Sequence, residues 1–246
     1  MFKKSRRLEE PPPGAGVDDL SEPEARIVAA VQPYTMTSPA RVTALVRAVD
    51  YVERRGLQGA FVECGVWRGG SVLAMLLKLL ELGVTSRHVY AFDSFEGMPE
   101  PTPADVSRYS GAALDEWNAA RDARRRPWGD VFDPASFSAD AVRDVLRGSG
   151  YPAEAVHVEA GLVEDTIPAS APDELAILRL DTDWYESTRH ELVHLYPRLV
   201  TGGVLIIDDY GHWEGCQRAV DEYFSGDAPP ILLTPVDYTG RIGVKA

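Results

Sequence analysis

Acidic side chains end four of the apolar segments in this sequence. The run VLIIDDYGHW passes from apolar residues to two adjacent aspartates, Asp208 and Asp209. Three other apolar runs end in Glu63, Asp93 and Asp181. If these runs are strands of one parallel sheet, the carboxylates gather at the edge where such sheets bind ligands. Carboxylates that meet at one edge repel one another unless a cation compensates them. The pattern therefore indicates a site for a positively charged ligand.

A divalent cation is the first candidate for that ligand. Asp181, Asp208 and Asp209 converge if the last two runs are neighbouring strands, and magnesium prefers carboxylate oxygens while it keeps some of its waters. The alternative is that Asp209 caps a helix or pairs with an arginine, and that Asp208 alone faces the edge. Arg179 is the nearby basic residue, and we expect it to point to the other side of its strand. The sequence thus predicts Mg²⁺ held by the three aspartates.

A glycine-rich turn follows the first apolar run. Gly65, Gly69 and Gly70 allow a tight turn and a close approach of the backbone to a ligand. The pattern is E-x-G-x-x-x-G and not the dinucleotide motif G-x-G-x-x-G. A carboxylate at Glu63 would repel a pyrophosphate and attract the cationic end of S-adenosylmethionine. Asp93 is placed to accept hydrogen bonds from the ribose hydroxyls. The alternative is an ordinary turn with solvated acidic side chains.

Further contacts to the cofactor are expected beside this turn. Ser71 closes the turn itself, and Ser94 begins the segment SFEGMP, which could shape the cofactor pocket. The segment GLVEDTIP carries Gly161 and Asp165 and follows the third strand, where adenine commonly lies. Asp165 would then hydrogen-bond the adenine amine. For both segments a simple turn is an equally good interpretation.

Histidines and large aromatic residues near the predicted site have less certain roles. His190 and His194 stand four apart, a zinc-compatible spacing, but no third ligand accompanies them, so a solvated helix face is favoured. His212 follows the aspartate pair closely enough to contact the substrate or support a ligand. Three aromatic side chains are expected to be substrate walls or core: Trp184, Tyr185 and Trp213.

Composition limits the class of protein. A chain of 246 residues suits one sizeable α/β domain. The net charge of −13 argues against a nucleic acid or an anionic membrane as partner. Two cysteines, Cys64 and Cys216, make no disulfide framework and fit the reducing cytoplasm. The longest apolar stretch, SVLAMLLKLLELGV, is too short to span a bilayer, and no signal peptide is recognisable. We expect a cytoplasmic protein with a small-molecule partner.

Strand-like and helix-like segments alternate after residue 60. Near-continuous apolar runs between amphipathic segments predict a parallel sheet covered by helices on both faces. The expected strands are AFVECG, HVYAFD, AVHVEAG, LAILRLD and GVLIIDD, and the expected helices cover 70–82, 138–147, 186–199 and 216–224. The last segments, ILLTPV and GRIGVK, face each other across DYTG and predict an antiparallel hairpin at the sheet edge.

The remaining segments define the domain organisation. Ser21 and Glu24 have the spacing of a capping box, Ser38 is a second N-cap, and Gly56 ends the second helix. The expected parts are a flexible leader at 1–20, an N-terminal helical cap at 21–57 and the main domain at 58–246, with a lid or acceptor loop at 95–137.

The segments YTMTS, FVECGVWRGGS, YAFDSFEGMP, LRLDTDWYEST and GGVLIIDDYGHWEGCQRAVDEY together resemble the macrocin O-methyltransferase family. The similarity runs from about residue 32 to the C-terminus, and LDxDxYEST and DDYG are its specific motifs. It implies a Rossmann-like class I methyltransferase fold, in which a seven-stranded, mostly parallel sheet carries a C-terminal antiparallel hairpin and an N-terminal helical cap. It also implies methylation of sugar hydroxyls on glycosylated natural products with S-adenosylmethionine and Mg²⁺, and a homodimer or larger homo-oligomer.

The resemblance also assigns residues. It implies that Asp181, Asp208 and Asp209 hold the metal and that Asp181 is the catalytic base. The YTMTS segment would fold over the cofactor, and its first residues, Tyr34, Thr35 and Met36, would bind it. This chain departs from the family pattern at Thr182, where glycine is common, at Trp184, where an aliphatic residue is usual, and over 100–137.

The expected mechanism is methyl transfer to a hydroxyl whose proton is removed in the site. Coordination to a divalent cation favours the alkoxide, and Asp181 could take the proton. Asp183 and His212 stay open as alternative bases. Two other functions remain possible from the sequence: a nicotinamide-dependent oxidoreductase on a similar sheet, and a non-catalytic relative of the fold. The glutamate in the turn and the aspartate cluster argue against the oxidoreductase, and the intact Asp181, Asp208 and Asp209 argue against a non-catalytic relative.

Overall fold

The structure of the protein is a computed structural model that describes residues 19–133, 137–226 and 228–246. The predicted leader at 1–20 therefore lies outside the described residues, except for Asp19 and Leu20. No helix within the described residues is long and apolar enough to cross a membrane.

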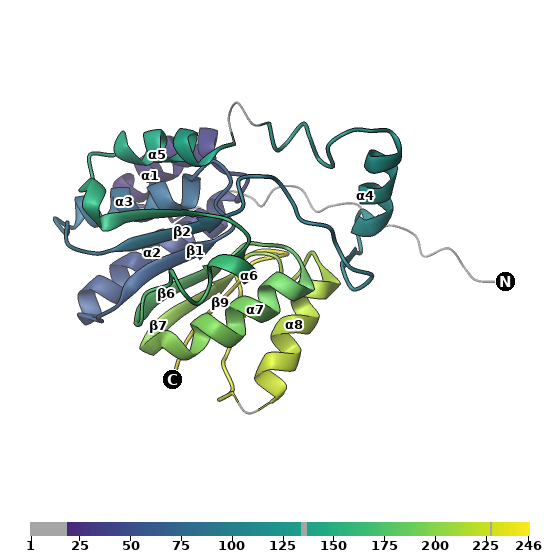
Figure 1. Ribbon diagram of the computed structural model, residues 1–246. Coiled ribbons are helices and arrows are strands. Elements are labelled where there is room, and N and C mark those ends of the chain that lie inside the picture. The colour runs from purple at the N-terminus through teal and green to yellow at the C-terminus, as the bar shows by residue number, and fades with distance from the viewer. Residues whose placement is uncertain (1–18, 134–136, 227) are drawn as a thin grey trace.

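A seven-stranded sheet forms the centre of the molecule (Figure 1). In spatial order its strands are β5 (Val156–Ala160), β2 (Val89–Asp93), β1 (Ala60–Cys64), β6 (Leu175–Leu180), β7 (Leu199–Ile207), β9 (Arg241–Val244) and β8 (Thr234–Pro235). The first five are mutually parallel, β9 runs antiparallel to β7, and β8 runs antiparallel to β9. The predicted fold class is confirmed, including the antiparallel hairpin at the sheet edge.

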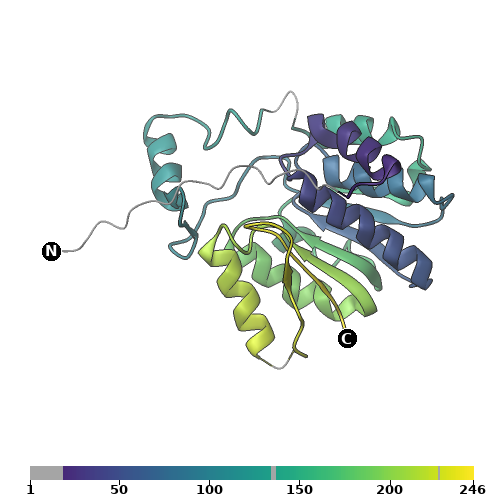
Figure 2. The same ribbon diagram turned by 180° about the vertical axis from the view of Figure 1, so that it is seen from behind.

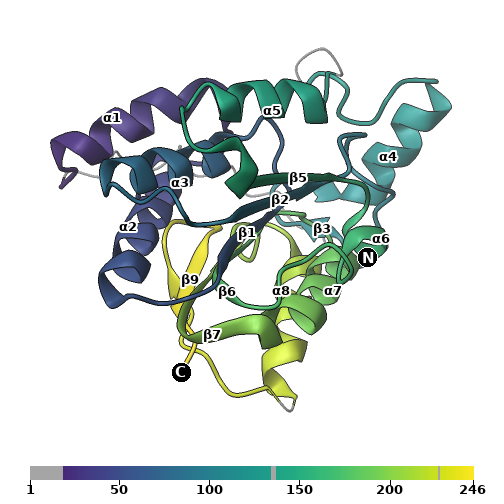
Figure 3. The same ribbon diagram turned by 60° about the vertical axis from the view of Figure 1, so that its left-hand side comes forward.

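Helices cover both faces of the sheet (Figures 1 and 3). One face carries α1 (Glu22–Val31), α2 (Pro39–Arg55), α3 (Gly70–Glu81) and α5 (Ala139–Arg147), and the other carries α6 (Val163–Thr166), α7 (Tyr185–Leu195) and α8 (Glu214–Ser225). Neighbouring strand residues point to opposite faces: Phe61 belongs to the core under α1, α2 and α3, and Val62 belongs to the core under α7 and α8. Burial on both faces explains why the strands are apolar throughout.

The two N-terminal helices begin and end at the predicted signals. Ser21 accepts a hydrogen bond from the Glu24 amide while the Glu24 carboxylate accepts one from the Ser21 amide, which completes the capping box. Ser38 caps α2, and Gly56 ends it in the left-handed conformation. Both helices join the layer that contains α3, and they share its hydrophobic core.

The largest differences from the predicted boundaries lie at the end of α7 and at the start of β7. Helix α7 ends at Leu195 and not at Leu199, and the 3₁₀ turn η3 (Tyr196–Arg198) follows it. Pro197 explains the early end, because it cannot donate the backbone hydrogen bond that continues an α-helix. Strand β7 then begins at Leu199, before the expected Gly203, and its residues from Val204 to Ile207 pair with β9.

The predicted lid region contains its own secondary structure. Strands β3 (Val106–Ser107) and β4 (Gly111–Ala112) form a small hairpin that leads into α4 (Ala113–Asp122). Figures 1 and 2 show α4 standing away from the central sheet, beyond the strand ends. The fully buried Asp105 anchors this region, because its carboxylate accepts hydrogen bonds from the Thr102 amide and hydroxyl and from the Tyr185 amide at the start of α7. Residues 134–136 of the predicted lid lie outside the described residues.

Candidate active site

A cavity of about 470 Å³ opens at the carboxyl ends of β1, β2, β6 and β7. Most of the predicted site residues line it: Tyr34, Thr35, Met36, Glu63, Gly65, Ser71, Asp93, Ser94, Asp181, Asp208 and Asp209. Residues from distant parts of the sequence therefore surround one space, as expected from the topology of a parallel sheet.

Three predicted cofactor residues do not reach this cavity. Gly69 caps α3 with a φ of 86°, and a Cβ atom there would lie 3.2 Å from the Val142 side chain of α5, so it serves helix packing. Gly161 donates its amide hydrogen bond to the Asp93 carbonyl. Asp165 is exposed on α6, and its neighbour Glu164 lines the cavity instead. The structure thus offers Glu164, and not Asp165, to a ligand in the cavity.

Asp93 organises the glycine turn. One carboxylate oxygen, Oδ2, accepts hydrogen bonds from the Val66 and Trp67 amides, and Oδ1 accepts one from the Phe95 amide. Gly65 has a φ of 80°, and a Cβ atom at this position would lie 1.8 Å from the Asp181 carbonyl oxygen. Only glycine can therefore bring the turn this close to the end of β6.

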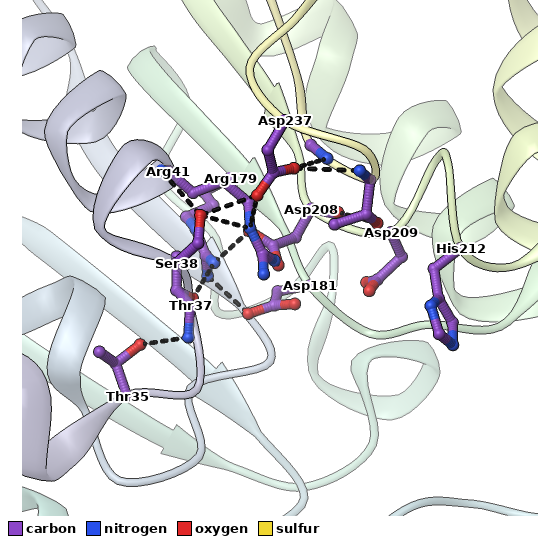
Figure 4. A network of polar contacts seen from close by, with 12 residues as sticks. Thr35, Thr37, Ser38, Arg41, Arg179, Asp181, Asp208, Asp209, His212 and Asp237 are labelled. Carbon is purple, nitrogen blue, oxygen red and sulfur yellow. Dashed lines mark hydrogen bonds and ion pairs between the residues drawn. The ribbon is translucent and has the colours of Figure 1, made fainter. Parts of the chain in front are cut away.

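The three predicted metal ligands lie together. One carboxylate oxygen from each of Asp181, Asp208 and Asp209 falls within 4.8 Å of the others, and within the described ranges 19–133, 137–226 and 228–246 no other group of three acidic, histidine or cysteine side chains does so. The adjacent Asp208 and Asp209 point in different directions (Figure 4). Successive residues along a strand direction point to opposite faces, so Asp208 points to the face of the sheet that α2 covers and Asp209 points towards Asp183. The Asp209 carboxylate accepts a hydrogen bond from the Asp183 amide at 3.3 Å.

The expectation that Arg179 points away from the aspartates is wrong. Residues two apart in a strand share a face, and Arg179 stands two before Asp181. The Arg179 side chain is 1% exposed and lies among the carboxylates (Figure 4). Its Nη1 donates to Glu63 at 2.5 Å and to Asp181 at 2.7 Å, and its Nη2 donates to Asp208 at 2.6 Å. The alternative prediction paired Asp209 with an arginine and left Asp208 alone, whereas the ion pairs of the described residues join Arg179 to Asp181 and Asp208.

Arg41 is a second cation that the sequence analysis missed. It lies in the first turn of α2 and pairs with the Oδ2 atom of Asp208 and, at 3.0 Å, with Asp237 from the C-terminal hairpin (Figure 4). Nothing in the local sequence links these three positions, because they come from separate elements. Other unpredicted lining residues include Thr37 and Trp67.

The two arginines do not compensate all of the acidic groups. Six carboxylates surround them: Glu63, Asp181, Asp183, Asp208, Asp209 and Asp237. Burial, and then the neighbouring Asp183 and Asp181, raise the pKa of Asp209 well above its usual range. Burial and the charge of Asp181 raise the pKa of Asp183 to about 7. The side of the cluster around Asp209 therefore retains an excess of carboxylates that a bound cation would compensate.

His212 lines the cavity but both of its ring nitrogens are engaged. Ser107 accepts hydrogen bonds at Oγ from the Tyr109 and Ser110 amides, which occupies both lone pairs of the hydroxyl. The Ser107 hydroxyl must then donate to His212 Nε2 at 3.2 Å, and His212 Nδ1 donates to the Tyr238 hydroxyl at 3.1 Å. This tautomer, assigned from the hydrogen bonds, leaves neither nitrogen ready to accept a proton from a substrate.

The aromatic residues divide between wall and core. Trp213 lines the cavity, and its indole N–H donates to Asp183 at 2.7 Å. Trp184 is buried, donates to the Pro99 carbonyl and packs edge-on against Trp213. The Tyr185 hydroxyl donates to Glu222 on α8. Of the three, only Trp213 is a wall of the cavity. The Nε2 atom of His190 forms a hydrogen bond with the Ile167 carbonyl, so this nitrogen is not directed at a metal site with His194.

The raised pKa values predict how the stability of the ligand-free protein depends on pH. Burial raises the pKa of Glu63 to about 8, so the folded protein holds protons at Glu63 and Asp183 that the unfolded chain releases near pH 4. This stabilisation is complete at low pH and is lost as the pH rises towards the folded pKa values. We expect the free energy of unfolding, measured in urea at pH 6.0, 6.75 and 7.5, to fall by up to about 1.4 kcal/mol per pH unit for each such proton and to level off above the folded pKa values.

Two variants check the origin of this pH dependence. Glu63→Gln removes one titrating group, so its stability should fall less steeply over the same range. Glu154→Gln, at an exposed position in η2 (Ala153–Ala155), should keep the slope of the natural protein. A slope that is flat in the natural protein, or equal in both variants, would contradict the assignment to Glu63.

Comparisons with known proteins agree with this geometry. The family model for macrocin O-methyltransferase (TylF) matches residues 19–242. One relative is 36% identical to this chain over 84% of this chain and 74% of its own length. It is the 8-demethyl-8-(2,3-dimethoxy-alpha-L-rhamnosyl)-tetracenomycin-C 4'-O-methyltransferase of Streptomyces olivaceus. The mycinamicin III 3''-O-methyltransferase of Micromonospora griseorubida is 35% identical over 77% and 70%.

A solved structure shows the same similarity. The O-methyltransferase NovP is 32% identical, superposes with a TM-score of 0.72, and the match covers 87% of this chain and 82% of that chain. The match decides between the methyltransferase and the nicotinamide-dependent oxidoreductase in favour of the former. The chain belongs to the macrocin O-methyltransferase family and is an S-adenosylmethionine-dependent O-methyltransferase.

Proposed function

We propose that this enzyme transfers a methyl group from S-adenosylmethionine to a sugar hydroxyl of a glycosylated natural product, with Mg²⁺ at the three aspartates. The observation that carries the proposal is that one cavity joins the glycine turn to the cluster of Asp181, Asp208 and Asp209. The relatives support the acceptor class, since the name of one of them specifies a rhamnosyl group on tetracenomycin C.

The cofactor end of the cavity fits the methionine part of S-adenosylmethionine. Glu63 is 1% exposed, and its Oε2 atom has no hydrogen-bond partner among the described residues although Glu63 lines the cavity. A buried carboxylate oxygen without a donor is costly, so a ligand with a cationic group or N–H donors fits it. We assign Glu63, Gly65 and Ser71 to this end, together with Tyr34, Thr35 and Met36 from the segment that precedes α2.

The nucleoside end is assigned to the other side of the turn. Asp93 Oδ1 accepts one hydrogen bond, from the Phe95 amide, and therefore retains a lone pair that can accept a hydrogen bond from a ribose hydroxyl. Ser94 lines the cavity next to Asp93. Apolar side chains that fit a purine ring line the same cavity: Phe132, Phe137, Leu162 and Val163. Glu164 replaces Asp165 as the candidate partner of the adenine amine.

The cation end fits magnesium by the chemistry of its donors. The three aspartates offer oxygen ligands. Arg41 and Arg179 pair with Asp208, and Arg179 also pairs with one oxygen of Asp181. Among the described residues, neither arginine forms a hydrogen bond to Asp209. When bound, a divalent cation makes a hydroxyl easier to deprotonate. Asp181 has a side chain 26% exposed, against 4% for Asp208, so Asp181 is the carboxylate that an acceptor can approach.

The residues of the chain then have defined tasks in methyl transfer. Arg179 donates to Asp181 Oδ2 and orients the carboxylate, which takes the proton of the acceptor hydroxyl as general base. The hydroxyl oxygen attacks the methyl carbon, the C–S bond breaks as the O–C bond forms, and neutral S-adenosylhomocysteine leaves. Trp213 and the lid residues exclude water, and the proton on Asp181 passes to solvent when the product departs.

Removal of the metal tests the proposal. We expect purified enzyme to methylate one or more hydroxylated glycosides in a mass-spectrometric screen with S-adenosylmethionine, and we expect EDTA to abolish the product mass shift. Excess Mg²⁺ should restore it, because the charge at the aspartates is compensated again. Full activity after exhaustive chelation would contradict the role of magnesium, and activity on free sugars or aglycones alone would contradict the acceptor class.

The location and assembly of the enzyme remain predictions. The free, buried Cys64 and Cys216 are consistent with a cytoplasmic enzyme. A homodimer or larger homo-oligomer stays a prediction. We retain the division into a helical cap at 21–57, a main domain at 58–246 and a lid at 95–137 as part of the proposal.

A further inference from the structure

Arg179 occupies the centre of the site and touches both of its ends. On the sheet it is directly opposite Glu63 of β1 and Ile206 of β7, and Asp208 follows Ile206 by two residues on the same face. Neighbouring parallel strands in this register place the side chains of Glu63, Arg179 and Asp208 on one face of the sheet. The guanidinium thus reaches acidic groups on either side from a rigid strand.

Each terminal nitrogen of Arg179 bridges the two ends of the cavity. Nη1 donates to Glu63 at the cofactor end and to Asp181 at the cation end. Nη2 donates at 3.0 Å to the Thr37 hydroxyl, in the segment that lines the cofactor end, and to Asp208 at the cation end. Figure 4 shows Thr37, Asp181 and Asp208 around the same guanidinium. One planar group therefore sets the spacing between four acceptors from four segments of the chain.

Resting on the proposed function, we propose that Arg179 is a positioning residue that couples the S-adenosylmethionine site to the magnesium site. The planar guanidinium carries N–H groups on separate nitrogens, so it can bond Glu63 and Asp208 at the same time and in fixed directions. Methyl transfer needs the sulfonium methyl and the acceptor hydroxyl in line, and a displacement of about 1 Å can cost about 100-fold in rate. Arg179 holds the carboxylates of both ends in that relation.

Lysine at this position separates charge from geometry. Arg179→Lys keeps the positive charge, but all N–H donors of lysine sit on one nitrogen atom at the end of a flexible side chain. The lysine therefore cannot bond acceptors at both ends of the cavity. We expect the affinities for S-adenosylmethionine and for Mg²⁺, measured separately by calorimetry on the folded variant, each to fall about 10- to 100-fold. We also expect kcat to fall more than KM for the acceptor rises, because alignment is lost in the assembled complex.

The matched control is Arg87→Lys. Arg87 is also largely buried and bonds a carboxylate, Glu53, and the carbonyls of Leu57 and Gly59, at the opposite end of the sheet. Its replacement should lower the melting temperature and leave both ligand affinities unchanged. A change in affinity with Arg87→Lys as large as that with Arg179→Lys would mean that any loss of a buried guanidinium has this effect, and would overturn the coupling.

Thr37→Val tests the same idea without touching the guanidinium. It removes one hydrogen bond that the Arg179 guanidinium donates to a hydroxyl at the cofactor end, so the affinity for S-adenosylmethionine should fall about three- to tenfold while that for Mg²⁺ stays the same. This variant decides the question if Arg179→Lys fails to fold. If Arg179→Lys bound both ligands with the affinities of the natural enzyme, the coupling role of Arg179 would be overturned while the proposed function would stand. The same holds if Thr37→Val bound S-adenosylmethionine with the natural affinity. A natural enzyme that binds S-adenosylmethionine but no Mg²⁺ would overturn the proposed metal site as well.

Discussion

Asp181→Asn is expected to lower kcat by about 100- to 10,000-fold while the enzyme still binds S-adenosylmethionine. The asparagine side chain has the shape of aspartate, but it cannot accept the proton of the acceptor hydroxyl and is a weaker ligand for a cation. Its carbonyl oxygen can still accept the hydrogen bond from Arg179, so the contacts of Arg179 with Glu63 and Asp208 should stay in place.

The measurement is methyl transfer followed by mass spectrometry, with cofactor binding by calorimetry on the same preparation. Asp140→Asn is the matched control, because Asp140 is a 91% exposed side chain on α5 that pairs only locally with Arg143 among the interactions of the described residues. It should retain full activity. Asp183→Asn addresses the remaining alternative for the base, since Asp183 has a pKa of about 7. If Asp183→Asn is inactive and Asp181→Asn is active, the base is Asp183 and our assignment is wrong.

Asp208→Ala is expected to abolish methyl transfer and to destabilise the fold by about 3–5 kcal/mol. The Asp208 side chain is 4% exposed and accepts from two guanidinium groups, Arg41 and Arg179. Its removal leaves two buried cations with fewer acceptors, and breaking a buried ion pair from one side costs far more than breaking an exposed one. One of the three predicted metal ligands is lost at the same time.

Urea unfolding and the transfer assay measure the two effects separately. Asp144→Ala is the control for stability, because its ion pair with Arg147 joins side chains that are 76% and 63% exposed, so the change should cost about 0–1 kcal/mol. Asp208→Asn keeps the shape and an acceptor oxygen, and it should be more stable than Asp208→Ala but equally poor in methyl transfer. Activity in either Asp208 variant would remove Asp208 from the metal site.

The helices and strands could be predicted because their signals are local. The capping box of Ser21 and Glu24, the glycine at the end of α2 and the apolar runs of the parallel strands each act within a few residues, and all three appear in the structure. The predicted end of α7 at Leu199 is wrong, because Pro197 ends the helix earlier, at Leu195.

The predicted cofactor contacts were less complete, and the reason is geometric. Glycine residues in a turn can serve a ligand or serve packing, and the sequence does not separate Gly65, which approaches β6, from Gly69, which packs on α5. Likewise Glu164 and Asp165 are adjacent acids in one short helix, and the helical rotation of about 100° per residue decides which of them lines the cavity.

The sequence by itself determined that carboxylates would meet at one edge of the sheet, because strand ends and their acidic residues follow from the order of apolar runs. Only the tertiary structure decided what compensates them. Asp208 and Asp209 are neighbours in the chain, yet the alternation of a strand sends Asp208 towards Arg41 and Arg179 and Asp209 towards Asp183. Arg41 reaches Asp208 from a helix 167 residues away in sequence, and such a contact depends on packing that no local pattern encodes.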